Sequence, residues 1–201
     1  MTIKDIILPL APTMIQNCEI CTRKTNFVKD IISYLQSKNY DVDVISKTQD
    51  YEDVGFSMSN IEEAANKLSI SQQNMMNILK DMEAENVSSQ DKLATPVPNK
   101  VIIIDSYDSY LSSNQYKHID IFKGSIGSMI RLGKKANIII IYIVNSLDSL
   151  PINLIGTTNK IILGKADKDS SSSYDVNTDN YDGTITIDNI YNNGKIVCLK
   201  L

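Results

Sequence analysis

Two short apolar runs interrupt the otherwise mixed pattern of the chain, at residues 101–104 and 138–144. Neither run contains a charged residue; the first is followed by Asp105 and the second by Asn145. Runs of this kind are typical of strands buried on both faces, as in a parallel sheet covered by helices. The polar residue after each strand then lies at the carboxyl edge of the sheet, where ligands of open α/β proteins bind.

Three stretches show the apolar spacing of amphipathic helices. The first covers residues 24–37 and is ended by Asn39. The second begins at a predicted capping box formed by Ser59 and Glu62. Its expected apolar face consists of Ile61, Ala65, Leu68, Met75, Leu79 and Met82. The third helix covers residues 116–132 and contains two glycines, which weaken it.

Shorter segments complete the predicted order of elements. The other predicted strands are 3–10, 40–45, 160–163, 183–187 and 195–199, of which the last two form a hairpin-like pair. Residues 13–21 stay ambiguous, with a strand around Met14 and Ile15 as one option. A short helix is predicted at 151–157, and loops at 46–58, 86–100 and 167–180. Strands that alternate with helices predict an α/β fold with a mostly parallel central sheet and helices on both faces.

Length and composition narrow the class of protein. The chain has 201 residues, and we expect a single domain over residues 1–201. Apolar residues make up 42% of the chain and the net charge is −4, which argues against a disordered chain and against a basic nucleic-acid-binding protein. The sequence contains no run of 18 apolar residues, the length needed to span a membrane, and residues 1–5 lack a signal-peptide pattern.

The three cysteines are Cys18, Cys21 and Cys198. An odd number in a chain of this length argues for a reducing compartment. Cys18 and Cys21 have the spacing of a zinc or redox pair, but the sequence holds no second pair. We therefore expect neither a metal nor a redox function from them. The single histidine, His118, is expected on a solvated helix start rather than in an active site.

Asp105 has the position of the Walker B aspartate of P-loop NTPases, which follows a buried strand and holds the magnesium ion of the nucleotide. The residue after that aspartate is usually a glutamate that activates water, and here it is Ser106. A buried strand that ends in aspartate is also common without any ligand, because aspartate readily opens turns. Asp108 lies too far along the chain to replace the missing glutamate.

A phosphate-binding Walker A loop requires Gly-x-x-x-x-Gly-Lys-Ser/Thr, because its glycines let backbone N–H groups curl around phosphates. The segment with the matching position, just before the first long helix, is residues 18–25. Lys24 and Thr25 match the motif, whereas Cys18 and Arg23 replace both glycines. The alternative interpretation is a helix that starts with solvated basic residues.

The order of parts after residue 100 resembles one known family. The strand that ends in Asp105 is followed by a helix ending in Arg131-x-Gly133, and then by a second buried strand that begins after Asn137. This order resembles the FtsK/SpoIIIE family of RecA-like ATPases, in which an Arg-x-Gly-x-x-x-Gly segment follows the aspartate strand. Asn137 replaces the last glycine, and asparagine tolerates the left-handed backbone that a helix end often needs. Residues 104–108, Ile-Asp-Ser-Tyr-Asp, resemble the Ile-Asp-Asn-Tyr-Asp of C-terminal ATPase modules in type VII secretion proteins of the EssC, EccC and YukB type.

The resemblance extends over about residues 14–201 and implies a RecA-like P-loop NTPase fold. Its implied nucleotide-binding residues are Arg23, Lys24, Thr25, Asp105 and Asn145, with Asp105 as the Mg²⁺ ligand. Because the glycines and the glutamate are both missing, we expect ATP and Mg²⁺ to bind weakly or not at all and ATP hydrolysis to be inefficient.

The resemblance also implies a role and partners. We expect the terminal module of a membrane-anchored type VII secretion protein, on the cytoplasmic side of the membrane, that recognises substrates and regulates upstream motor domains. The implied partners are upstream ATPase domains of the same chain and secreted substrates of the WXG100 type, and a homo-oligomer is compatible with this role. One alternative is an atypical ATPase completed by a neighbouring subunit. Another is a DNA translocase module, against which the acidic net charge counts.

Overall fold

The computed structural model describes six parts of the chain, residues 13–17, 23–87, 99–144, 159–163, 184–189 and 194–199. Seven strands in these parts form one sheet in the order β2-β3-β4-β1-β5-β7-β6. The strands are β1 (Thr13–Asn17), β2 (Asp41–Ile45), β3 (Lys100–Ile104), β4 (Ile138–Val144), β5 (Asn159–Leu163), β6 (Thr184–Asn189) and β7 (Gly194–Leu199). All neighbouring strands pair in parallel except β6 and β7, which pair antiparallel. The predicted α/β class with a mostly parallel sheet is confirmed.

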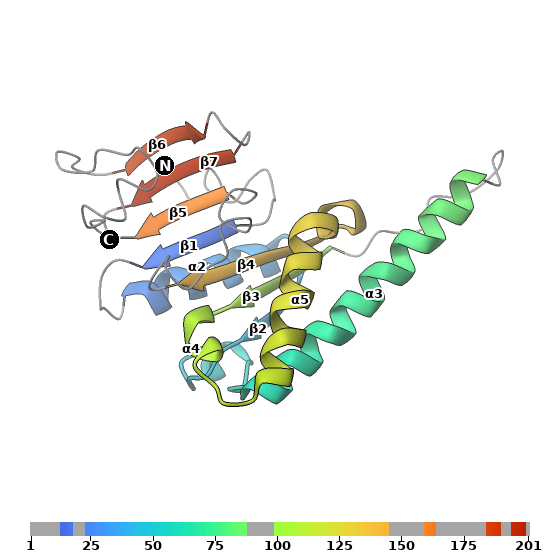
Figure 1. Cartoon of the computed structure of the whole chain (residues 1–201). Coiled ribbons are helices and arrows are strands. Elements are labelled where there is room, and N and C mark those ends of the chain that lie inside the picture. The colour runs from blue at the N-terminus through green and yellow to red at the C-terminus, as the bar shows by residue number, and fades with distance from the viewer. Residues whose placement is uncertain are drawn as a thin grey trace.

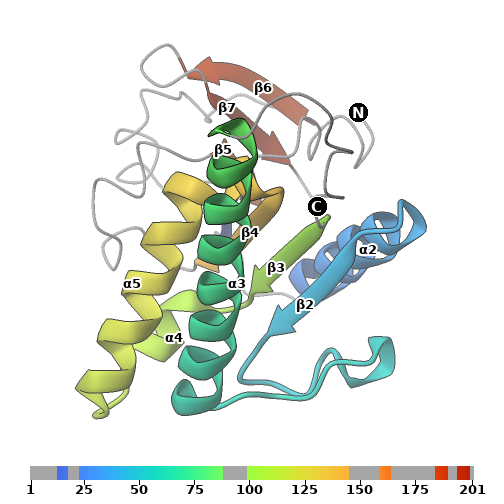
Figure 2. The same ribbon diagram turned by 90° about the vertical axis from the view of Figure 1, so that its right-hand side faces the viewer.

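Helices cover both faces of the sheet, as expected (Figure 1). The long helices are α2 (Arg23–Ser37), α3 (Ile61–Val87) and α5 (Tyr116–Leu132). Helix α2 lies on one face, and α3 and α5 lie side by side on the other, as the turned view in Figure 2 shows. Helices α3 and α5 run in the same direction, because each follows a parallel strand that ends at the same edge of the sheet.

Successive residues of each strand point to opposite faces of the sheet and belong to two separate hydrophobic cores, one on each face. On β3, Val101 and Ile103 pack with α2, whereas Ile102 and Ile104 pack with α3 and α5. All seven residues of β4 are buried in the same alternating manner. The two runs that the sequence marks as strands buried on both faces are therefore the middle of the sheet. The prediction of residues 138–144 agrees with β4 at both ends.

The capping box of α3 lies one residue later than the sequence prediction. The Asn60 side chain accepts a hydrogen bond from the Glu63 N–H at 3.0 Å, and the Glu63 carboxylate accepts one from the Asn60 N–H at 2.9 Å. The prediction of Ser59 and Glu62 is wrong, because Ser59 is buried and its hydroxyl accepts a hydrogen bond from Lys67. Both pairs fit the capping-box spacing, and only the tertiary burial of Ser59 decides between them.

Two tight chain reversals follow the predicted pattern. Asn39 and Asn137 both adopt left-handed backbone, with φ of 61° and 52°, and Asn137 ends the short 3₁₀ helix η2 (Gly133–Ala136). The expected left-handed role of Asn137 is confirmed. Gly133 is required for a different reason, since a Cβ atom there would lie 2.4 Å from the Ile138 carbonyl oxygen.

Several shorter predictions can be compared with the structure. The strand around Met14 and Ile15 is present as β1, residues 160–163 belong to β5, and the C-terminal pair is present as β6 and β7. The loop predicted for 46–58 contains a 3₁₀ helix, η1 (Glu52–Val54). The sequence pattern does not predict the short helix α4 (Tyr107–Leu111), which follows Asp105 and Ser106 directly. Predictions for 3–10, 151–157 and 167–180 lie outside the described residues.

Candidate functional site

The carboxyl edge of the sheet brings together the start of α2 and Asp105. Residues Arg23, Lys24 and Thr25 form the first turn of α2, just beyond β1, and Asp105 follows β3 directly. Strand β4 lies between β1 and β3, so the two strand ends are separated by about 10 Å, twice the usual strand spacing. Asn145, predicted to lie at the end of β4, is outside the described residues. The topology thus places the backbone of the first turn of α2 and Asp105 at the same edge of the sheet.

The Asp105 side chain is buried and engaged in hydrogen bonds. Its exposed fraction is 1%, and it continues the alternation of Val101 and Ile103 toward the face covered by α2. Its Oδ2 accepts a hydrogen bond from the Tyr51 hydroxyl at 2.9 Å, and its Oδ1 accepts one from the Ser106 hydroxyl at 3.2 Å. The position expected to bind magnesium therefore serves as an internal hydrogen-bond acceptor.

Ser106 occupies the position of the missing glutamate and has an unusual backbone conformation. Its φ and ψ are 56° and 49°, in the left-handed region that non-glycine residues rarely adopt. The Ser106 carbonyl accepts hydrogen bonds from the Ser109 N–H at 2.9 Å and from the Ser109 hydroxyl at 2.7 Å, which hold the first turn of α4. The chain thus turns sharply into α4 immediately after Asp105.

Tyr51 is a site residue that the sequence reasoning missed. It lies between β2 and α3 in a polar stretch, yet its side chain is fully buried. Burial, together with the nearby Asp105 carboxylate, raises the pKa of the Tyr51 hydroxyl well above its usual value. The residue stays protonated and can only donate to Asp105. A tyrosine flanked by Asp50, Glu52 and Asp53 has no apolar periodicity, so the sequence offers no signal of this burial.

An open recess of about 430 Å³ lies beside the first turns of α2. Its lining residues are Thr25, Asn26, Lys29, Gln49, Asp50, Glu52 and Asp53. Lys29 Nζ lies 2.8 Å from both carboxylate oxygens of Asp53, and this hydrogen bond lowers the pKa of Asp53. Three carboxylates against one ammonium group give the recess a net negative charge, which repels phosphate groups.

Magnesium-bound nucleotide does not fit this arrangement. A nucleotide-bound Mg²⁺ needs an accessible carboxylate oxygen, and Asp105 is buried with Tyr51 on one oxygen. The adjoining recess carries acidic side chains where phosphates would approach the start of α2. Among the described residues, no cluster of three or more His, Cys, Asp or Glu side chains is arranged as a metal site.

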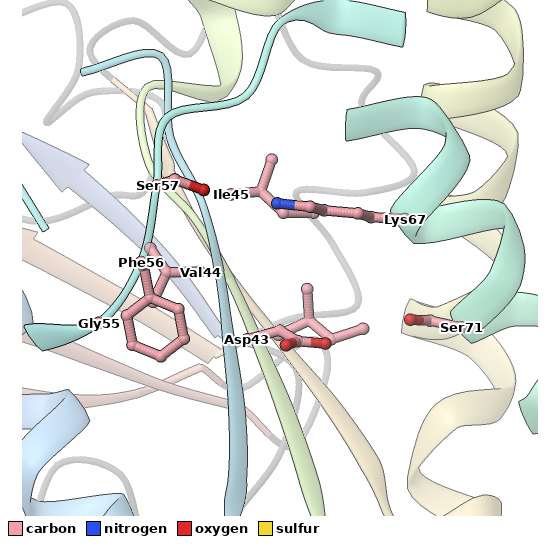
Figure 3. Close-up of a pocket in the computed structure, with 9 residues that line it drawn as sticks. Asp43, Val44, Ile45, Gly55, Phe56, Ser57, Lys67 and Ser71 are labelled. Carbon is pink, nitrogen blue, oxygen red and sulfur yellow. The ribbon is translucent and has the colours of Figure 1, made fainter. Parts of the chain in front are cut away.

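A second cavity, of about 130 Å³, lies between β2 and α3 (Figure 3). Asp43 and Lys67 bring opposite charges to its walls, but each is already engaged. Asp43 forms an ion pair with Lys100 at 2.6 Å, and Lys67 donates to the Ser59 hydroxyl at 2.8 Å. Both charged groups thus already have hydrogen-bonding partners within the chain, and the cavity lies on the face of the sheet opposite α2.

An aromatic cluster fixes α4 against the sheet. The Tyr107 ring lies 5.6 Å from that of Phe122 and 5.9 Å from that of Tyr142, and the Tyr110 ring lies 5.0 Å from Phe122. The Tyr110 hydroxyl donates to the Ser59 carbonyl at 3.0 Å, and Lys47 lies over the Tyr110 ring. The backbone that follows Asp105 is thereby held rigidly from both sides.

The remaining sequence candidates are the two N-terminal cysteines and His118. Cys18 and Cys21 lie outside the described residues. His118 is in the first turn of α5, as predicted, but it is half-buried rather than solvated, and its Nδ1 has no partner in the described part of the chain. None of the helices that the structure describes has both the length and the apolar character needed to cross a membrane.

The fold is similar to that of a solved ATPase structure. The sequence itself matches no protein-family model and no curated protein. The solved structure of EssC (ATPases 2 and 3) from Geobacillus thermodenitrificans superposes with a TM-score of 0.67 over 95% of this chain, at 14% sequence identity. This chain has an EssC-like ATPase fold. It spans 39% of the length of that EssC chain, and identity this low establishes the fold and not the activity.

Proposed function

We propose that this chain is a non-hydrolysing, ATPase-like module of the FtsK/SpoIIIE type that acts in type VII secretion. It has the EssC-like fold, and the carboxylate that would hold magnesium is bound by the Tyr51 hydroxyl instead. This hydrogen bond to Asp105 is the observation that carries the proposal. The same site lacks the glutamate that would orient water, because Ser106 occupies its position.

Loss of the phosphate-binding loop supports the same conclusion. Two glycines of the motif are replaced by Cys18 and Arg23, so side chains occupy positions where the backbone has to approach phosphates closely. The acidic recess beside α2 adds an electrostatic penalty for a triphosphate. The phosphate-binding segment, the position of the general base and the metal ligand are thus all unsuited to ATP hydrolysis. The central sheet and both hydrophobic cores are nevertheless retained.

Calorimetric titration with Mg-ATP tests this proposal. We expect no binding heat at millimolar nucleotide for the wild-type chain, and the same result for Lys24→Ala and Asp105→Ala. Binding that both substitutions abolish would overturn the proposal, because it would show a functional site built from the first turn of α2 and the end of β3.

In this proposal the module works through protein contacts at the cytoplasmic side of a membrane-anchored secretion protein. Its partners are the upstream ATPase domains of that protein and the C-terminal segments of WXG100-type substrates. Fluorescence anisotropy with a labelled C-terminal substrate peptide tests the second contact, with a scrambled peptide of the same composition as control. Saturable binding of the native peptide alone is expected, and equal binding of both peptides would contradict substrate recognition.

A second candidate is an atypical ATPase whose missing base comes from a neighbouring subunit. The observation that favours it is the common edge of Lys24, Thr25 and Asp105, which is the edge that a nucleotide would need. This candidate predicts phosphate release that rises more steeply than linearly with protein concentration and disappears in Lys24→Ala. Release at background level at every concentration would exclude it.

A further inference from the structure

Helices α3 and α5 carry opposite charges on one face of the molecule. They lie side by side over the sheet, and in Figure 2 no described element stands in front of them. Helix α3 has five acidic and two basic side chains, a net charge of −3. Residues 116–136, which comprise α5 and η2, have five basic side chains and one acidic side chain, a net charge of +4 with histidine counted as neutral. The charge of this face is therefore segregated by helix.

Contacts inside the molecule do not account for these charges. Glu62 and Asp81 of α3 are exposed, as are Lys117 of α5 and Lys135 of η2, and none of the four forms an ion pair with another described residue. Helix α3 also has no basic side chain in its last turn, where the helix dipole would favour one. The charges of both helices are thus directed at the surroundings of the molecule.

A polar contact fixes how the two helices align. The Ser125 hydroxyl donates to Gln72 Oε1 at 2.8 Å, and Gln72 Nε2 donates to the Ser128 hydroxyl at 3.1 Å. Because α3 and α5 run in the same direction, each α3 residue lies level with the α5 residues that follow it by 53 to 56 positions in the chain. This alignment decides which residues of the two helices lie at the same height.

The outward faces of the helices have complementary shapes at one height. Ile70 follows the buried Leu68 by two positions, about 200° around the helix, and its side chain is 63% exposed. Gly124 has the same relation to the buried Phe122, and nothing lies within 4 Å of a Cβ atom added to it. Ile70 and Gly124 lie level with each other in this alignment. Helix α3 thus presents an exposed apolar side chain at the height where α5 presents bare backbone.

A two-fold axis parallel to the helices would bring these two features together between two copies. Rotation about such an axis places α3 of each copy on α5 of the other and leaves all heights along the helices unchanged. Ile70 of one copy then faces Gly124 of the second copy. A glycine weakens a helix, and contact with Ile70 of a second copy gives Gly124 a role that no contact inside the chain gives it.

The charges select the same axis. With the axis parallel to the helices, Glu62 faces Lys117 of the second copy near the helix starts, and Asp81 faces Lys135 near the helix ends. An axis across the helices would instead place α3 on α3 and bring acidic side chains together. Charge complementarity therefore favours one arrangement of the two copies over the other.

We propose that the outer face of α3 and α5 binds a second copy of this chain, in a two-fold dimer that pairs each acidic α3 with a basic α5. The central contact is Ile70 on Gly124, and the charge pairs lie toward both ends of the helices. This proposal goes beyond the secretion role. Neither nucleotide nor substrate peptide enters its test, so it can fail or succeed separately.

Sedimentation velocity of the 201-residue chain, over about a hundredfold range of protein concentration, measures the dimer. The α3 variant carries Glu62→Lys and Asp81→Lys, and the α5 variant carries Lys117→Glu and Lys135→Glu. Each variant places like charges opposite each other at four points of the dimer, so its dissociation constant should rise by about 30-fold or more. A mixture of the two variants, and a chain with all four substitutions, should dimerise like the wild type, because opposite charges face each other again.

Gly124→Leu tests the central contact without disturbing the core. The added side chain meets open space inside its own molecule, so the thermal unfolding midpoint at low protein concentration should not fall. In the dimer it would displace Ile70 of the second copy, and the dissociation constant should rise at least about tenfold. Ile70→Asn should also weaken the dimer, whereas Met58→Asn, at an exposed apolar residue outside both helices, is the matched control and should not.

Three results would overturn the proposal. The first is a wild-type chain that sediments as a monomer at every concentration, which would leave this face to a different protein. The second is dimerisation of the α3 and α5 variants with the affinity of the wild type. The third is a chain with all four substitutions that stays monomeric, since restored complementarity would then have failed to restore the dimer.

Discussion

The hydroxyl of Tyr51 donates a hydrogen bond to Asp105 across 54 residues of sequence, at 2.9 Å, and both side chains are buried. The bond joins the segment between β2 and α3, which contains η1, to the end of β3. In an ATPase of this fold a carboxylate in that place would face a magnesium ion, and here it faces a phenol that burial keeps protonated. The Tyr51 side chain therefore determines which group Asp105 can bind at the carboxyl edge of the sheet.

A double-mutant cycle measures this bond. Removal of the hydroxyl in Tyr51→Phe leaves a buried carboxylate short of one donor, so we expect each of Tyr51→Phe and Asp105→Ala to destabilise the fold. The coupling energy should be about 1.5–3 kcal/mol in urea unfolding, as for other hydrogen bonds to charged groups. Tyr34→Phe combined with Asp105→Ala serves as control and should be additive. Additivity for the Tyr51 pair would contradict the bond.

Removal of the Tyr107 hydroxyl should not destabilise the fold, in contrast to removal of the Tyr51 hydroxyl. Its hydroxyl is buried without a hydrogen-bond partner among the described residues. Replacement by phenylalanine removes a buried polar group that makes no bond, so Tyr107→Phe should leave stability at pH 7 unchanged or raise it by up to about 1 kcal/mol. A loss above about 1 kcal/mol in thermal unfolding would show that the hydroxyl does have a partner.

Stability should fall at alkaline pH. Burial raises the pKa of Tyr107 to about 12 and also raises that of Tyr51 and Tyr110 above their usual value of 10.0. Since the folded-state pKa is the higher one, the stabilisation is complete below pH 10 and is lost as pH rises from there toward 12. Ionisation of each such tyrosine lowers the free energy of unfolding by up to about 1.4 kcal/mol per pH unit in this window. Urea titrations between pH 8 and 12 should show a smaller slope for Tyr107→Phe, and equal slopes would contradict the assignment.

The glycines within α5 and the glycine that follows it differ in whether they tolerate a side chain. Gly124 and Gly127 lie inside α5 with nothing within 4 Å of an added Cβ atom. Gly124→Ala and Gly127→Ala should each raise the free energy of unfolding by about 0.5–1 kcal/mol, because alanine favours the helix. Gly133→Ala should lower it by about 1–3 kcal/mol, since its Cβ atom would meet the Ile138 carbonyl. Thermal unfolding of the three variants ranks them, and a stabilised Gly133→Ala would contradict the close contact.

Substitutions at the start of α3 distinguish the observed capping box, Asn60 with Glu63, from the predicted one, Ser59 with Glu62. Asn60→Ala should cost about 1 kcal/mol in unfolding free energy, because it removes the acceptor for the Glu63 N–H. Glu62→Ala is the matched control and should change stability by less than about 0.5 kcal/mol. A larger effect of Glu62→Ala would restore the capping box that begins at Ser59.

Substitutions at Ser106 test whether a glutamate at this position would by itself restore ATP hydrolysis. At φ 56° a glutamate should destabilise the chain by about 1 kcal/mol relative to Ser106→Asn, because asparagine tolerates left-handed backbone better. We expect phosphate release to stay at background in both variants. Release by Ser106→Glu above that of Ser106→Asn would show that nucleotide does bind and would favour the atypical ATPase.

The sequence by itself determined the elements whose signal is local. Strands β3 and β4 follow from continuous apolar runs, and α2 and α5 from helical spacing, because burial on one or both faces repeats with the period of the element. Left-handed Asn137 also follows from its own side chain. The placement of Lys24 and Asp105 at one edge follows from the order of strands and helices.

Only the tertiary structure decided what Asp105 contacts. Tyr51 reaches it from a polar loop without periodicity, and its burial depends on how that loop crosses the end of β3. The shift of the α3 cap from Ser59 to Asn60 has the same origin, since long-range contacts of Ser59 with Lys67 and Tyr110 remove it from the cap. Periodic patterns fix the direction of side chains within an element, whereas hydrogen bonds between distant segments depend on how those segments pack in space.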